Sequence, residues 1–124
     1  MELNSHFFAT VFARHIREGS DAFHLGDNDA ALCCFGRALE LAREAKGPYD
    51  RRVGLSYNHL GAAHHAKGET ELAACRFLAA LDPLLVSFGP RSDQVKDCYT
   101  NLGRVFADRG EVSLAKLCQD KAAG

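Results

Sequence analysis

Six histidines and five cysteines are the side chains of this 124-residue chain that could bind a metal ion or act as a catalytic base or nucleophile. Two metal ligands on one helix share a face only when they are three or four residues apart. No histidine pair has that spacing. His64 and His65 are adjacent, which places them about 100° apart on a helix, and His6, His15 and His24 are nine residues apart. The sequence therefore predicts no metal site.

The cysteines give little support for redox, zinc or nucleophilic chemistry. Their number is odd, no C-x-x-C pair occurs, and they fall on segments with helical periodicity: Cys33, Cys34, Cys75, Cys98 and Cys118. We expect reduced thiols that serve as small core residues. Because H-E-x-x-H, G-x-S-x-G and phosphate-binding glycine motifs are missing from the sequence, a protein without catalytic residues or cofactors is favoured. A cysteine nucleophile beside His59 stays open, since spatial neighbours cannot be seen in a sequence.

Composition and charge exclude several other classes of protein. Apolar residues make up 47% of the chain and charged residues 25%, which is typical of soluble globular proteins and not of disordered chains. The net charge of −1 provides no field that would attract nucleic acid or anionic lipid. No apolar run approaches the roughly 20 residues that span a bilayer, and the N-terminus lacks the features of a secretory signal. We expect a cytoplasmic protein that binds neither nucleic acid nor membrane.

The elements that carry these side chains follow an internal repeat of 42 residues. The pair Gly47-Pro48 recurs as Gly89-Pro90, and Phe35 recurs as Phe77. Four triplets of small residues share the same spacing: Gly19, Gly61 and Gly103; Gly26, Gly68 and Gly110; Ala31, Ala73 and Ala115; Ala38, Ala80 and Ala122. A fixed period of this length is typical of repeat architectures.

The turn residues divide each repeat into two helices. Gly26, Gly68 and Gly110 each follow an amphipathic run, where a helix can end in a left-handed residue. Proline after Gly47 and Gly89 cannot continue a helix interior, so a new helix begins after it. These signals predict an all-α chain with helices at about 5–25, 29–46, 50–67, 70–88, 92–109 and 112–122.

Apolar residues at three-four spacing predict the buried face of the second helix in each repeat. In the first repeat these are Leu32, Phe35 and Leu39, and in the second they are Leu72, Cys75 and either Leu78 or Ala79. One helical hairpin cannot bury such a face alone. Stacking neighbouring hairpins does bury it, and about three repeats are needed for stability.

These residues resemble the tetratricopeptide repeat. Its first-helix pattern appears as Tyr57, Leu60, Gly61 and His64 and as Tyr99, Leu102, Gly103 and Phe106; its second-helix pattern appears as Ala31, Phe35 and Ala38 and as Ala73, Phe77 and Ala80. The first repeat departs from the pattern with His15 and Glu18, and the third with Gln119. The long period is similar to that of kinesin light chain and LGN-type adaptors. The resemblance implies a right-handed superhelical stack of three antiparallel helical hairpins, in a single domain over residues 1–124 with repeats at about 5–47, 48–89 and 90–124.

The resemblance also implies a concave groove, lined by the first helix of each repeat, that binds a peptide segment of a partner protein. The groove residues predicted from it are Arg17, Phe23, Asn58, His59, His65, Asn101 and Arg104. The asparagine amides suit a peptide backbone because an amide both donates and accepts hydrogen bonds. The arginines suit a ligand carboxylate, and Phe23 suits an apolar side chain. We therefore expect a partner segment with acidic and apolar residues.

A second hypothesis is assembly of the chain with itself or within a longer repeat array. The segment from His6 to Phe12 contains Phe7, Phe8, Val11 and Phe12, which is more apolar surface than one face of a first helix needs. The last hairpin has no further polar helix to cover it, although repeat arrays usually need such caps. The phenylalanines could equally pack on the second helix of their own repeat.

Overall fold

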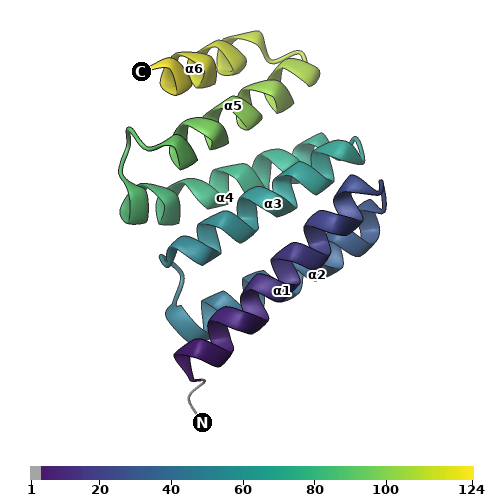
Figure 1. Cartoon of the computed structure of the whole chain (residues 1–124). Coiled ribbons are helices and arrows are strands. Elements are labelled where there is room, and N and C mark those ends of the chain that lie inside the picture. Colours follow the sequence, from purple (N-terminus) through teal and green to yellow (C-terminus); the bar gives the residue numbers. More distant parts are fainter. Residues whose placement is uncertain (1–3) are drawn as a thin grey trace.

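The computed structural model describes residues 4–124 and contains six α-helices within that range (Figure 1). They are α1 (Ser5–His24), α2 (Asn28–Lys46), α3 (Arg51–Ala66), α4 (Thr70–Phe88), α5 (Asp93–Asp108) and α6 (Val112–Ala123). Every boundary lies within one residue of the predicted helices. The second helices begin at residues 28, 70 and 112, which reproduces the 42-residue period of the sequence.

Glycines end the helices as predicted. Gly26, Gly68 and Gly110 have φ angles of 81°, 78° and 77°, in the left-handed region that a side chain disfavours. Side chains begin the helices that follow the Gly-Pro breaks: Asp50 accepts a hydrogen bond from the backbone N–H of Arg52, and Ser92 accepts one from Val95. These local contacts explain why the helix boundaries could be placed from sequence.

The helices stack in chain order. Each first helix packs on the second helix of its own repeat, and α2 and α4 also pack on the first helix of the next repeat. Figure 1 shows the three hairpins following one another from the N-terminus to the C-terminus. The predicted all-α solenoid of antiparallel hairpins is confirmed.

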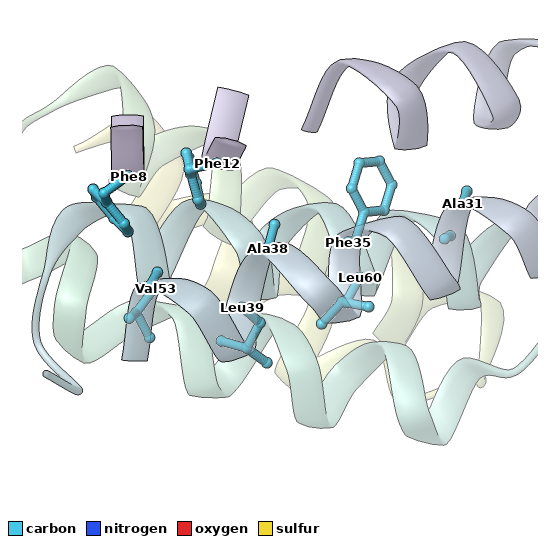
Figure 2. Packing of buried hydrophobic residues seen from close by; sticks show 10 residues of the cluster. Phe8, Phe12, Ala31, Phe35, Ala38, Leu39, Val53 and Leu60 are labelled. Atoms are coloured by element: carbon cyan, nitrogen blue, oxygen red, sulfur yellow. The ribbon is translucent and has the colours of Figure 1, made fainter. Parts of the chain in front are cut away.

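Two buried clusters hold the stack together. The first contains Phe8, Phe12, Phe35 and Leu60 with neighbouring apolar residues, and Figure 2 shows it between the first hairpin and α3. The second is formed around Phe77 by apolar residues of α4, α5 and α6. Tyr57 borders both clusters, so burial is continuous between hairpins rather than confined within each one.

Close helix contact depends on glycine in the first helix and phenylalanine in the second. A Cβ atom added to Gly19 would lie 2.5 Å from the Phe35 ring, and one added to Gly61 would lie 2.7 Å from the Phe77 ring. The third repeat lacks this contact because Gln119 takes the phenylalanine position, and the nearest atom to a Cβ on Gly103 would be 3.4 Å away. The regular spacing of small residues along the chain therefore reflects direct ring-to-backbone packing in two repeats.

The predicted buried stripe is correct for α2 and wrong for α4. Phe35 and Leu39 are buried and Leu32 is partly buried, as expected. In α4, however, the predicted residues are exposed: Leu72, Cys75, Leu78 and Ala79. The helix buries Ala73, Phe77, Ala80 and Leu84 instead. Three-four spacing shows that residues share a face, but α4 has two apolar faces, and the one with small alanines allows the closer approach to α3.

The predicted assembly surface is also corrected, because Phe8 and Phe12 are core residues. They are 1% and 9% exposed, whereas Phe7 is 56% exposed and Val11 is partly buried. Phe8 lies on an additional N-terminal turn: α3 begins at position 51, equivalent to residue 9, but α1 begins at residue 5. Lys46 Nζ and Arg52 Cζ cover the Phe8 ring at 5.3 Å and 5.0 Å from its centroid.

Phe12 of the first helix fills core space that, in the next hairpin, is filled by a side chain of the second helix. Its repeat position is that of Gly54, which packs tightly on Leu84, with only 2.9 Å between an added Cβ and that side chain. In the first repeat the Leu84 position is held by Ala42. The large side chain thus comes from α1 in one hairpin and from α4 in the next, and both fill the same part of the core.

The outward faces of the first and last described hairpins are polar. In α3 and α5, three positions of the repeat are buried against the preceding hairpin. The equivalent positions of α1 hold Arg14, Glu18 and Asp21. Arg14 and Glu18 form an ion pair at 3.8 Å. On α6, Lys116 and Gln119 take the places of Ala74 and Phe77. The sides of α1 and α6 that would meet a further repeat are therefore polar, although Val112, Leu114 and Leu117 are exposed on other sides of α6. The hypothesis that the last hairpin takes part in assembly stays a prediction.

Candidate functional site

The exposed sides of the first helices form a common surface in the second and third repeats. His65 on α3 and Asp108 on α5 meet across 43 residues of sequence, with His65 Nε2 2.6 Å from Asp108 Oδ2. Asn58, Asn101 and Arg104 belong to the same two helices. This surface, which we call the first-helix surface, carries side chains from two neighbouring repeats.

The candidate groove residues of α3 and α5 differ in how far they are exposed to solvent. Asn58, His65 and Asn101 are partly buried, and Arg104 is exposed. Asn58 Oδ1 is buried and makes no hydrogen bond within residues 4–124. Asp108 lies on α5 one turn after Arg104, on the helix face that the repeat resemblance predicts to line the groove. It follows His65 by 43 residues, one more than the repeat, so the two side chains are expected on facing sides of adjacent first helices.

His59 is mainly a packing residue. Its ring stacks on Phe35 of α2, with a centroid distance of 4.7 Å and an interplanar angle of 21°. Burial lowers the pKa of His59 below its ordinary value of 6.5, because the charged form would lose its hydration. The prediction that His59 contacts a ligand remains a prediction, but the face of its ring is occupied by Phe35.

Arg17 and Phe23 lie on α1, apart from the α3 and α5 group. Arg17 has the repeat position of His59, so it projects on the side of α1 where none of the described helices packs. Phe23 is partly buried against the first core cluster and lies edge-on to His24 at 5.8 Å. The structure therefore brings Asn58, His65, Asn101 and Arg104 onto two contacting helices, but it does not join Arg17 to them.

A second set of polar contacts maintains the spacing of the repeats. Lys67, just before a turn glycine, pairs with Asp29 at the start of α2 at 2.6 Å. Arg109, one repeat later, donates to Thr70 Oγ1 at the start of α4 at 3.3 Å. The hydrogen bond to Asp29 raises the pKa of Lys67. These exposed contacts repeat with the fold, which identifies them as links between hairpins rather than as ligand groups.

Burial disfavours the thiolate form of Cys34, Cys98 and Cys118. All five cysteines are free. Cys98 Sγ donates a hydrogen bond to the Phe77 carbonyl at 3.3 Å, and burial raises the pKa of Cys98 to about 12. Burial also raises the pKa of Cys34, so neither thiol is a ready source of thiolate. Among the described residues, no three His, Cys, Asp or Glu side chains are grouped so that they could hold a metal ion.

A pocket of about 390 Å³ opens on a different part of the molecule. It is lined by Glu40, Arg43 and Glu44 of α2 and by Pro48 of the following turn. None of the predicted groove residues lines it. The first-helix surface and this pocket are therefore separate features of the molecule.

Comparison with known families decides the identity of the fold. A model of the tetratricopeptide repeat matches residues 13–82, which is more than half of the chain. The chain belongs to the tetratricopeptide repeat family. This fold is a scaffold for protein–protein interaction. The sequence matches none of the curated proteins with which it was compared.

Two solved structures with the same architecture are similar over nearly the whole tetratricopeptide repeat chain. BtubC from P. vanneervenii has a TM-score of 0.87 at 21% identity, over 98% of this chain and 48% of that one. The chain thus spans about half the length of BtubC. The TPR domain of Arabidopsis FLU has a TM-score of 0.83 at 17% identity, over 94% of each chain. At these identities the likeness establishes the fold alone. No helix among the described residues is long and apolar enough to cross a membrane.

The position of His59 predicts a pH dependence of stability. Its pKa is lower in the folded chain than in the unfolded chain, so the unfolded state binds the proton more tightly. The contribution of His59 to stability is complete above about pH 6.5 and is lost as the pH falls below that value. We expect His59→Asn, which introduces the residue of the third repeat, to reduce the fall in melting temperature between pH 7.5 and pH 5.5. Equal falls in both proteins would show that His59 does not titrate in this way.

Proposed function

We propose that this tetratricopeptide repeat protein is a cytoplasmic, non-catalytic scaffold that binds a peptide segment of a partner protein on the first-helix surface. The observation that carries the proposal is the direct contact between α3 and α5 through His65 and Asp108. That contact aligns the side chains of two repeats into one surface. The exposed Cys33 and Cys75 thiols suit a reducing compartment, which supports the cytoplasmic location.

The chemistry of the surface supports a ligand that carries both backbone and carboxylate groups. Asn101 can donate and accept hydrogen bonds, as an extended peptide backbone requires. The buried Oδ1 of Asn58 cannot accept from a ligand on this surface, so Asn58 could contribute only its amide N–H groups. Arg104 is exposed and can form a paired hydrogen bond with a carboxylate. Asp108 shares a hydrogen bond with His65, and Arg104 makes none of the ion pairs found among the described residues. We infer a partner segment in which an acidic residue lies beside apolar ones.

A peptide selection tests this proposal and does not require the partner protein to be identified first. Peptides enriched on the wild-type protein from a random displayed library would be synthesised, and their dissociation constants measured by fluorescence anisotropy. We expect enrichment of acidic and apolar residues, and a loss of affinity of at least about tenfold in Asn101→Ala/Arg104→Glu, because a charged hydrogen bond is worth roughly 1.5–3 kcal/mol.

Arg37→Glu is the matched control for this experiment. Arg37 is exposed on α2, so its reversal changes the net charge by the same amount as Arg104→Glu but leaves the first helices unaltered. Peptide affinity should not change in this variant. Equal affinity of the selected peptides for wild type and the α5 double variant would instead place the binding site on another surface.

A further inference from the structure

Arg104 and Asp108 carry opposite charges and lie one turn apart on α5, but they do not pair with each other. Both side chains are exposed, and four residues is a spacing at which side chains of one helix meet. Within residues 4–124, the contact of the Asp108 carboxylate is with His65 of α3, and Arg104 is left without an ion-pair partner.

The same order and spacing of charges gives ion pairs elsewhere in the chain. Three other pairs within single helices place a basic residue four positions before an acidic one: Arg14 and Glu18, Arg17 and Asp21, and Lys116 and Asp120. The first and the last of these are ion pairs, at 3.8 Å and 3.6 Å, and the middle one is not. Helix geometry therefore permits a pair between Arg104 and Asp108, and the contact with His65 gives a physical reason for its absence.

The hydrogen bond from His65 is the stronger of the two contacts open to Asp108. An ionised carboxylate can only accept, so His65 Nε2, which lies 2.6 Å from Asp108 Oδ2, is the donor. A hydrogen bond to a charged group stabilises more than an exposed ion pair on one helix, because water screens the two charges of the ion pair. His65 is also the more buried partner, with 26% of its side chain exposed against 58% for Asp108. Asp108 is therefore bound to α3 rather than to Arg104.

Stacking of the repeats does not itself require a polar contact at this position. The residues that correspond to His65 and Asp108 one repeat earlier are Phe23 and Ala66, which cannot form a hydrogen bond between their side chains. Asp108 is also the last residue of α5, where the helix dipole disfavours a negative charge. The His65–Asp108 contact is therefore a particular feature of the second and third repeats and not part of the general packing of the array.

We infer that His65 is a positioning residue for partner binding: its hydrogen bond to Asp108 keeps that carboxylate from pairing with Arg104 and leaves the guanidinium group free for a carboxylate of the partner. The inference rests on the proposed binding of an acidic residue by Arg104. Asp108 is then an internal competitor of the partner's acidic residue, and His65 holds it away. His65 acts on binding through Asp108 and Arg104 rather than by touching the peptide.

A rescue experiment tests this role, with the acidic peptides selected on the wild-type protein as probes and fluorescence anisotropy as the measurement. His65→Ala should weaken binding by about two- to fivefold, because the peptide must then displace an exposed ion pair. Asp108→Asn in the His65→Ala background should restore the affinity, since the competing charge is removed. Asp120→Asn in the same background is the matched control: it removes one negative charge from α6, at an exposed ion pair with Lys116, and should restore nothing.

A crystal structure of His65→Ala tests the same inference without any ligand. A guanidinium nitrogen of Arg104 is expected within about 4 Å of an Asp108 oxygen, and side chains that stay apart overturn the inference. It is also overturned if Asp108→Asn alone weakens binding as much as His65→Ala, which would mean that the contact only holds α3 to α5, or if Asp108→Asn fails to rescue His65→Ala. Failure of the proposed function is recognised separately, because the selected peptides would then bind Asn101→Ala/Arg104→Glu as tightly as wild type, and the inference would fall with it.

Discussion

Gly61→Ala is expected to lower the free energy of unfolding by about 1–3 kcal/mol, the usual cost of overpacking a core. The new methyl group would lie 2.7 Å from Cε1 of Phe77, whose side chain is 1% exposed in the core. The three atoms nearest to an added Cβ all belong to that ring. Either α3 and α4 must separate or the ring must leave its position in the core.

Gly103→Ala is the matched control because it makes the same change at the same repeat position. The nearest atoms to the new methyl group would be Cys118 Cβ at 3.4 Å and the Ala115 carbonyl oxygen at 3.5 Å, which are ordinary contacts. Since alanine favours a helix by about 0.5–1 kcal/mol relative to glycine, this variant should be as stable as wild type or more so. Urea unfolding followed by circular dichroism measures both changes.

The cause of the Gly61 effect can be isolated with Phe77→Leu. If the clash with the ring is responsible, this substitution should cost less in the Gly61→Ala background than in wild type. Additive effects of the two substitutions, or equal losses in Gly61→Ala and Gly103→Ala, would contradict the packing explanation.

Phe8→Ala is expected to cost about 3–5 kcal/mol, because a buried phenylalanine is replaced by a cavity. The Phe8 ring stacks near Phe12 at 6.1 Å and lies under the cationic groups of Lys46 and Arg52. Its removal would free the additional N-terminal turn of α1 and expose the end of the first core cluster. A loss of this size is a large part of the roughly 5–15 kcal/mol that stabilises a typical domain, so the melting temperature should fall strongly.

Phe7→Ala provides the comparison, since the neighbouring side chain is 56% exposed. A surface substitution of this kind usually changes stability by less than about 0.5 kcal/mol. Thermal unfolding of the two variants therefore separates a core role from a surface role for adjacent residues. Similar losses in both variants would mean that α1 does not pack as described.

Part of the candidate site could be predicted from the sequence. The repeat and the family resemblance placed Asn58, His65, Asn101 and Arg104 on first helices, and the structure brings α3 and α5 into contact. The same reasoning did not show that His59 packs on Phe35 or that Arg17 faces away from α3. Those outcomes depend on whether a helix of a preceding repeat lies beside the residue. His59 has α2 as such a neighbour, whereas Arg17 has none among the described residues.

The sequence by itself determined the number, length and order of the helices. Left-handed glycines, Gly-Pro breaks and capping residues act within a few residues of the chain, so their effect can be inferred locally. Only the tertiary structure decided which apolar face of α4 is buried and that Phe8 and Phe12 belong to the core. Periodicity shows that side chains share a face, but the choice between faces depends on the space that a neighbouring helix leaves. That space is filled by residues of another helix, as Leu84 of α4 fills it for Gly54 of α3.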